Sequence, residues 1–378
     1  MKFLYVAPRY HTNQIPVMKG LGERGHSVFF FSHYAGKIED YSQVVPEIIG
    51  YSQVFKLIDC LYVKVLRRKD PLACDWKLLH GFPPVFRIRH RMKELKPDLV
   101  IIRERSVYSI VTYLICVELG LKAVLYDQSP LYRELKTDMA HRLVRKLTPK
   151  VRMTPVMGVA EEGKVREENS FFVPFVMELF CAPENRDYCP DEKIRIFTVG
   201  KYEERKNLLM MAQTVGKLSD LYNIHLTIAG ECSNEFHREY YERLCRYIEE
   251  EGLGDRITLL QNLSREEMWD RYGETDLFVI PSTREPASIS QLEAMAFSIP
   301  VICSDTNGSA CYVQDGHNGC LFRDNDPESL GEAVERMVRA PLELVRMGKN
   351  AYGDVREKYQ IENYFKGIME CMSCLEKR

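Results

Sequence analysis

DLFVIPSTREPASISQLEAMAFSIP, residues 276–300, is the stretch that decides the fold. Its apolar run at 277–280 predicts a short strand, and the segment at 291–296 is strongly helix-forming. Two glutamates, Glu285 and Glu293, lie eight positions apart across the loop and the start of the helix. Strand, loop and helix in this order form the basic unit of an α/β fold, which binds ligands where its strands end.

The start of this helix is a candidate phosphate site. We expect Pro286 in the first helical turn, where a missing N–H costs nothing. The next three amides would then point out of the helix and, with its dipole behind them, favour phosphate. Glu293 would lie two turns in, up to roughly 12 Å from Glu285 at about 1.5 Å per residue. That layout suits a nucleotide sugar, although two solvated glutamates on an exposed helix are the alternative. The three amides belong to Ala287, Ser288 and Ile289.

Three cations follow an earlier apolar strand, expected at 194–199, and its turn at Gly200. Lys201 and Lys206 are expected to reach a diphosphate as point charges. Arg205, whose guanidinium can donate two parallel hydrogen bonds to a phosphate, is an alternative. A charged surface loop is the other interpretation, because two glutamates are interleaved with the cations.

Five blocks resemble, in order and spacing, the donor half of the family 4 retaining glycosyltransferases (glycosyl transferases group 1). They are VGKYEERKN, LTIAGE, ITLLQNLSREEMWDRYGETDLFVIPS, REPASISQLEAMAFSIPVICSD and NGSACYVQDGHNGCLFRDNDPESL, and the resemblance covers roughly residues 194–340. The resemblance implies that Glu293 holds the ribose, and that Glu285 holds the donor hexose at the catalytic centre. It also implies that Lys201 and Lys206 hold the diphosphate and that Asn262 lies at the nucleobase.

The resemblance further implies a GT-B fold, in which two Rossmann-like, doubly wound α/β domains face each other across a cleft and a C-terminal helix, here at 361–376, crosses back to the first domain. We expect an acceptor-binding domain at 1–180, a linker at 181–190 and a nucleotide-sugar donor-binding domain at 191–360. The alternation of strands and helices agrees with two parallel sheets. Strands are expected at 2–6, 27–32, 98–102, 122–126, 151–156 and 171–173, and then at 194–199, 224–229, 256–260, 277–280, 300–303 and 319–322.

Because the sequence departs from the family pattern at two places, the resemblance does not identify the donor sugar. Pro286, Ala287 and Ser288 stand where many relatives have a Gly-Phe-Gly type of turn, and Ser298 stands where the helix usually ends in glycine. Side chains then occupy space near the donor hexose that glycines would leave empty. No side chain in the sequence indicates which nucleobase the donor carries.

Polar residues after the strands of the first domain are candidates for acceptor contact. His11 and Asn13 follow the first strand, Arg103 follows the strand at 98–102, and Asp127 follows the strand at 122–126. We expect His11 to contact the acceptor or a donor phosphate, a structural histidine being the alternative. Asp127 is expected to contact the acceptor or to handle a proton.

The two halves carry opposite charge, which the net charge of −2 hides. Residues 1–180 hold 28 Lys and Arg against 19 Asp and Glu, and residues 181–378 hold 24 against 35. Basic clusters at 64–69, 87–93 and 142–146 interleave with apolar residues and would be attracted to an anionic inner-leaflet membrane. Complementarity between the two domains is the alternative. No recognised motif accompanies the charge, so nucleic acid is not an expected partner.

The chain is expected to be cytoplasmic, peripheral at the inner membrane face. Its first apolar run is too short for a signal peptide, and no apolar stretch of about 18 residues is present. The 12 cysteines are scattered among apolar runs, as Cys116, Cys303 and Cys320 illustrate, which predicts free, mostly buried thiols. Asp324-Asn325-Asp326 resembles an Asp-x-Asp metal motif, but Asp326 is expected to cap a helix instead. We therefore expect no metal and no cofactor.

The expected function is metal-independent transfer of a hexose-type sugar, with retention, from a nucleotide diphosphate sugar to a glycan or lipid-linked acceptor in cell-surface polysaccharide biosynthesis. Most relatives use uridine nucleotides. The cations and the helix start would neutralise the leaving diphosphate. A sugar-nucleotide epimerase, a phosphorylase and a non-catalytic nucleotide-sugar-binding scaffold subunit are the alternatives.

Overall fold

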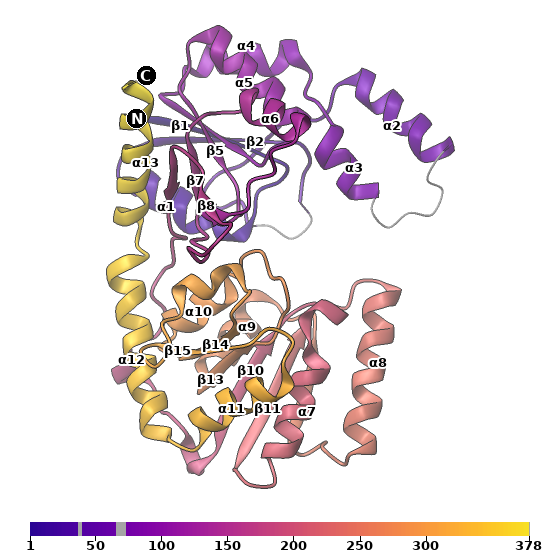
Figure 1. Cartoon of the computed structure of the whole chain (residues 1–378), viewed down its shortest axis with the longest axis vertical. Helices are drawn as coiled ribbons and strands as arrows, with labels where there is room; N and C mark the ends of the chain where they lie inside the picture. Colours follow the sequence, from indigo (N-terminus) through magenta and orange to yellow (C-terminus); the bar gives the residue numbers. More distant parts are fainter. Residues whose placement is uncertain (37–39, 66–72, 378) are drawn as a thin grey trace. The chain divides into compact units, whose positions relative to one another are not determined.

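The computed structural model describes residues 1–36, 40–65 and 73–377 (Figure 1). Within them the chain forms two compact units. The first consists of Met1–Val176 and Ile361–Arg378, and the second of Met177–Gln360. Most of the basic cluster at 64–69 lies outside the described residues.

The first unit is built on a seven-stranded sheet in which all paired strands are parallel. Its order is β3 (Glu47–Ile48), β2 (Ser27–Ser32), β1 (Lys2–Ala7), β4 (Leu99–Arg103), β5 (Ala123–Tyr126), β7 (Arg152–Thr154) and β9 (Ser170–Phe172). A small antiparallel pair, β6 (Tyr132–Arg133) and β8 (Val165–Arg166), lies beside it.

Helices cover both faces of this sheet because its central strands are apolar on both sides. Phe3 and Tyr5 of β1 pack in one core with α1 (Ile15–Glu23) and α13 (Ile361–Glu376), and Leu4 and Val6 pack in another with α4 (Val85–Leu95) and α5 (Val107–Leu119). The remaining helices of the unit are α2 (Gln53–Val65), α3 (Ala73–His80) and α6 (Met139–Lys146).

The second unit has a six-stranded parallel sheet. Its order is β12 (Ile257–Gln261), β11 (Ile224–Gly230), β10 (Ile194–Val199), β13 (Leu277–Ile280), β14 (Val301–Ser304) and β15 (Gly319–Phe322). The order reverses between β10 and β13, and loops at the carboxyl ends of these two strands are where such a sheet binds ligands.

Two layers of helices enclose the second sheet. Ile194 and Ile196 face a core with α7 (Leu208–Leu218), α8 (Glu235–Glu250) and α11 (Pro327–Val338). On the other face, Phe197 and Phe278 meet an aromatic cluster with Tyr272 and Phe297. Figure 1 shows α9 (Arg265–Gly273) and α10 (Ser290–Ala296) in this layer and α12 (Pro341–Lys358) alongside.

The fold class predicted from the sequence is confirmed. The twelve expected strands are present with ends that agree within a few residues, and the last helix packs in the first unit, where Ile361 contacts Gly20 and Val173 contacts Gly367. The two-residue strands β3, β6 and β8 were not predicted, because they are too short to carry a periodic pattern.

Residues 181–190, the expected linker, lie instead within the second unit. The guanidinium of Arg186 is the physical reason, since it donates to the backbone carbonyls of Phe297 and Thr275 and thereby ties the segment to helix and strand ends. Tyr188 likewise donates to the carbonyl of Ser298.

No helix among the described residues is long and apolar enough to cross a membrane. The cysteines of the described part are free thiols, as predicted, but the prediction that most are buried is wrong, because among them only Cys116, Cys303, Cys320 and Cys371 are buried.

Candidate active site

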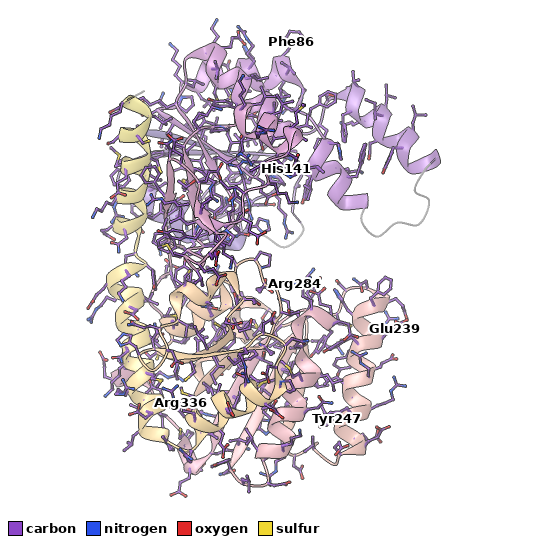
Figure 2. All side chains as sticks on the ribbon, in the orientation of Figure 1. Phe86, His141, Glu239, Tyr247, Arg284 and Arg336 are labelled. Carbon is purple, nitrogen blue, oxygen red and sulfur yellow. The ribbon has the colours of Figure 1, made fainter. Side chains whose placement is uncertain are left out.

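Two loops of the second unit are joined directly beyond the ends of β10 and β13. The side chain of Asn207, which has a φ of +50°, donates to the carbonyl of Pro281 at 3.1 Å. The amide of Thr283 donates to the carbonyl of Arg205 at 2.9 Å. These two bonds hold the loop at 200–207 against the loop at 281–289, which Arg284 marks in Figure 2.

Glu285 is the centre of a charge cluster formed by these loops. One of its oxygens, Oε2, accepts from Lys206 Nζ at 2.5 Å and from Arg205 Nη1 at 2.7 Å. The side chains of Glu285 and Lys206 are only 12% and 13% exposed. Burial alone would raise the pKa of Glu285, but the two cations outweigh burial and lower it. Glu285 is therefore held as a carboxylate.

The cluster carries no net formal charge. Arg205 also donates to Glu203 at 2.9 Å, so two cations face two carboxylates. A diphosphate must therefore use the spare N–H groups of Lys206 and Arg205 or displace Glu203.

The two lysines of the sequence prediction have different surroundings. Gly200 lets Lys206 lie across the turn, since a Cβ on Gly200 would come within 3.0 Å of the lysine side chain. Lys201 is half exposed and pairs with Glu231 at 3.4 Å. The structure thus brings Lys206 and Arg205 to Glu285 but places Lys201 in a separate ion pair.

The predicted helix start is wrong by four residues. Helix α10 begins at Ser290 rather than at Pro286, so Glu293 is its fourth residue and not two turns inside it. Pro286 lies in a bend, and the amide of Ser288 donates to Ser309 Oγ at 2.7 Å instead of pointing out of a helix. The reason is the loop at 305–309, whose side chains and backbone hold residues 285–288 out of the helix.

Three residues of this clamp were not predicted. The amide of Gly308 donates to the carbonyl of Glu285 at 2.7 Å, and a Cβ on Gly308 would lie 1.7 Å from the carbonyl oxygen of Pro286. Ser309 Oγ donates to the carbonyl of Ser288 at 2.9 Å, while Gln291 donates to the carbonyl of Ser309 at 2.6 Å. The glycine in Asn-Gly-Ser at 307–309 was the signal in the sequence for this close approach.

Glu293 is in a different environment from Glu285. Its Oε2 accepts from the hydroxyl of Tyr272 at 3.0 Å, and that hydroxyl lies 3.2 Å from the carbonyl of Ser290. Burial raises the pKa of Glu293, although the bond from Tyr272 opposes this effect. Tyr272 lies in α9 and is fully buried. No pattern in the sequence marked Tyr272 as a partner.

Asn262 organises the loop that follows β11. Its Oδ1 accepts from the amide of Cys232 at 2.9 Å and its Nδ2 donates to the carbonyl of the same residue at 3.3 Å. With its side chain used in this way, Asn262 offers its backbone rather than its amide group to a ligand. Its nucleobase role stays a prediction.

Asp326 caps α11, as predicted, because its Oδ1 accepts from the amides of Glu328 and Ser329 at 3.0 Å. Asp324 accepts from the hydroxyl of Thr283 at 2.7 Å. No group of three or more metal-ligating side chains occurs among the residues that the structure describes.

The acceptor-side candidates lie in the first unit. Arg9 Nε lies 3.2 Å from His11 Nε2, and burial together with Arg103 and Arg9 lowers the pKa of His11 to about 3. His11 is thus a neutral ring between two cations. Arg103 and Asn13 line a small cavity of about 30 Å³. Within the described ranges, Arg103 Nη1 and Asn13 Oδ1 are buried without a partner.

Asp127 is engaged in a buried ion pair. Its Oδ1 lies 2.6 Å from Arg152 Nη1, and the two side chains are 9% and 1% exposed. Arg152 also donates to the carbonyls of Ser129 and Pro130, both at 3.0 Å. The geometry gives Asp127 a structural task at the end of β5, and its role in acceptor contact or proton transfer stays a prediction.

A separate recess of about 480 Å³ lies beneath α9 on the β10–β12 face, lined by His225, Thr258 and Leu260 among others. It contains none of the candidate donor residues. We therefore place the candidate active site at the charge cluster and not at this recess.

Comparisons with known proteins first define the class. Alr3699/HepE of Anabaena, solved in complex with UDP, superposes with a TM-score of 0.72 at 13% identity and covers 99% of this chain and 100% of that one. The fold is therefore that of the GT-B glycosyltransferases.

Sequence comparison then concerns the second unit. Residues 186–354 match the model of the family Glycosyl transferases group 1. The uncharacterized glycosyltransferase MJ1607 of Methanocaldococcus jannaschii is 31% identical over 47% of this chain. The lipopolysaccharide core biosynthesis mannosyltransferase LpcC of Rhizobium leguminosarum is 30% identical over 37% of it. The matches span 43% and 39% of these relatives, so less than half of either protein is compared.

Proposed function

We propose that the protein transfers a hexose-type sugar from a nucleotide diphosphate sugar, with UDP as the carrier, to a glycan or lipid-linked acceptor in cell-surface polysaccharide biosynthesis. The observation that carries the proposal is the Glu285–Lys206–Arg205 cluster at the sheet's switch point, inside a glycosyl transferases group 1 domain. The names of the relatives and the UDP of the structural neighbour support it.

The residues have distinct tasks in this proposal. Lys206 and Arg205 donate to the diphosphate as it leaves, and negative charge that grows on the leaving group strengthens these bonds in the transition state. Glu285 keeps the two cations in place beforehand and accepts a hydrogen bond from the donor hexose. Glu293 accepts from the ribose hydroxyls.

Retention and independence of metal are parts of the same proposal. In the proposed front-side course, the acceptor hydroxyl attacks from the side of the leaving diphosphate, so the phosphate itself can take the hydroxyl proton. The cations supply the charge stabilisation that a divalent metal supplies in other transferases.

A donor screen tests the proposal. UDP-, GDP- and ADP-hexoses are incubated with a lipid extract and a glycan panel in the presence of EDTA, and release of nucleotide and labelled product are both measured. The proposal requires transfer by the wild type and its loss in Glu285→Ala, with unchanged folding. Transfer at wild-type rates in Glu285→Ala contradicts the site assignment.

A non-catalytic nucleotide-sugar-binding scaffold is the second candidate. The engaged amide of Ser288 and the zero net charge of the cluster favour it, since both leave fewer free donors for a diphosphate. It predicts binding of a nucleotide sugar without turnover for any acceptor in the screen.

A further inference from the structure

Helix α2 of the first unit exposes a continuous row of aliphatic side chains. Val54, Leu57, Ile58 and Leu61 stand at positions i, i+3, i+4 and i+7, and so share one face of the helix. They are 61%, 68%, 45% and 64% exposed. We call these four residues the apolar stripe.

The orientation of the stripe is fixed by the other side of the helix. Phe55 is buried and packs against the rings of Tyr51 and Phe82. Asp59 pairs at 3.0 Å with Lys77 of α3, and the ring of Tyr62 stacks on Trp76 at 4.1 Å. Figure 1 shows α2 beside α3 at the margin of the first unit. The stripe therefore faces outward because the helix is anchored through a different face.

Such a stripe differs from ordinary exposed apolar residues. Leu221, Phe236 and Leu342 of the second unit are also exposed, but they stand singly on different elements, as is normal for a protein surface. Four aliphatic side chains on one helical face form a contiguous apolar surface, which water disfavours and which marks an interaction site.

The charge of the surrounding sequence selects the kind of partner. Residues 53–93 contain ten Lys and Arg against three Asp and Glu, and two of these cations, Arg89 and Arg91, form ion pairs with Glu118 and Glu47 outside the segment, which leaves an excess of positive charge. A twofold dimer through the stripe would bring this basic segment against itself, because such an interface places the same surface on both subunits. An anionic surface instead attracts it. An amphipathic helix within a basic stretch of sequence is typical of helices that lie in the membrane interface.

We propose that the apolar stripe of α2 docks the protein on an anionic lipid bilayer, with the helix lying in the plane of the interface. The docking surface deepens the proposed function, since it would bring the enzyme to a lipid-linked acceptor, and in this respect it rests on that function. The binding itself depends only on the first unit's surface.

Vesicle co-sedimentation of the full chain tests the proposal. Vesicles of phosphatidylglycerol and phosphatidylcholine in equal parts are compared with vesicles of phosphatidylcholine alone, at low and at high salt. We expect the wild type to sediment with the anionic vesicles and to be released by salt. Leu57→Ser/Leu61→Ser should weaken this binding by about tenfold or more, because two large aliphatic groups no longer enter the interface.

Matched controls keep the result interpretable. Leu221→Ser/Leu342→Ser removes two equally exposed leucines from the second unit and should sediment like the wild type. UDP-induced thermal stabilisation is measured for the wild type and for both double variants. A loss of nucleotide binding can then be distinguished from a loss of vesicle binding. Equal stabilisation in all three establishes that the stripe variant is folded.

Three outcomes overturn the proposal. They are the absence of wild-type binding to anionic vesicles, unchanged binding of the stripe variant, and equal binding to both kinds of vesicle. If light scattering finds a wild-type dimer that the stripe substitutions convert to a monomer while no vesicles are bound, the stripe's partner is a second copy of this chain.

Discussion

Lys206 Nζ lies 2.5 Å from Glu285 Oε2, and this ion pair joins the loop beyond β10 to the loop beyond β13. Both side chains are largely buried, so each is needed to keep the other's charge compensated. The pair is also where the proposed diphosphate and hexose would meet. Stability and donor binding therefore depend on the same contact.

Lys206→Ala is expected to weaken UDP binding by roughly 10- to 100-fold, because it removes a charge-assisted hydrogen bond of about 1.5–3 kcal/mol. It should also lower thermal stability, since Glu285 keeps only Arg205. Lys201→Ala is the control: its ammonium is half exposed and paired with Glu231. Calorimetric titration measures both. Equal losses in the two variants would restore the sequence-based assignment of both lysines to the diphosphate.

Glu293→Gln separates stability from function. Because burial raises the pKa of Glu293, its proton is favoured in the folded state. The stabilisation from this proton is complete below the unfolded pKa and is lost as pH rises through the folded pKa. The variant, which stays neutral, should therefore gain melting temperature over the wild type as pH increases from 4 to 8, yet bind nucleotide more weakly. A difference in melting temperature that does not change with pH would contradict this account of Glu293.

Gly308→Ala tests the clamp on the donor loop. A Cβ there would meet the carbonyl oxygen of Pro286 at 1.7 Å, so residues 285–288 must move. We expect loss of UDP binding and a lower melting temperature. Gly331→Ala in α11 is the matched control, because nothing lies within 4 Å of its Cβ and alanine stabilises a helix interior by about 0.5–1 kcal/mol. Unchanged UDP affinity in Gly308→Ala would show that the clamp does not position Glu285.

Asp127→Asn distinguishes a structural carboxylate from a catalytic one. Its removal leaves the buried Arg152 with only Glu167, 3.4 Å away, as a counter-charge, and breaking a buried pair costs up to about 3–5 kcal/mol. Urea unfolding should record a loss of this size, and UDP binding should persist wherever the protein is still folded. Full stability combined with lost transfer would instead support the role in proton handling.

The sequence was most informative where one pattern had one physical meaning. Apolar runs of three to six residues predicted the strands, and Asp326 before Pro327 predicted a helix cap that the structure contains. The start of α10 was mispredicted because Pro286 fits both a helical first turn and a bend. What decides between them is Ser309, which is 21 residues away from Ser288 in the chain. Contacts between residues this far apart in the chain produce no recognisable local sequence pattern.

The same limit applies to the site. Spacing and charge brought Glu285, Lys206 and Arg205 into one hypothesis, and the structure places them together. Nothing in the spacing distinguished Lys201 from Lys206, because the distinction depends on Gly200 and on Glu231 at the end of the neighbouring strand. Tyr272 was missed because its partner Glu293 lies 21 residues further along, in a different helix.

Thermal unfolding with UDP, GDP and ADP, in EDTA, tests the central claim most directly. A nucleotide at about 100 times its dissociation constant adds roughly 2.7 kcal/mol of stability. We expect UDP to stabilise the wild type selectively, Lys206→Ala and Glu293→Gln to reduce the effect, and Lys201→Ala to preserve it. Stabilisation by none of the three nucleotides, or an unchanged response in Lys206→Ala, would contradict a donor site at the Glu285–Lys206 pair.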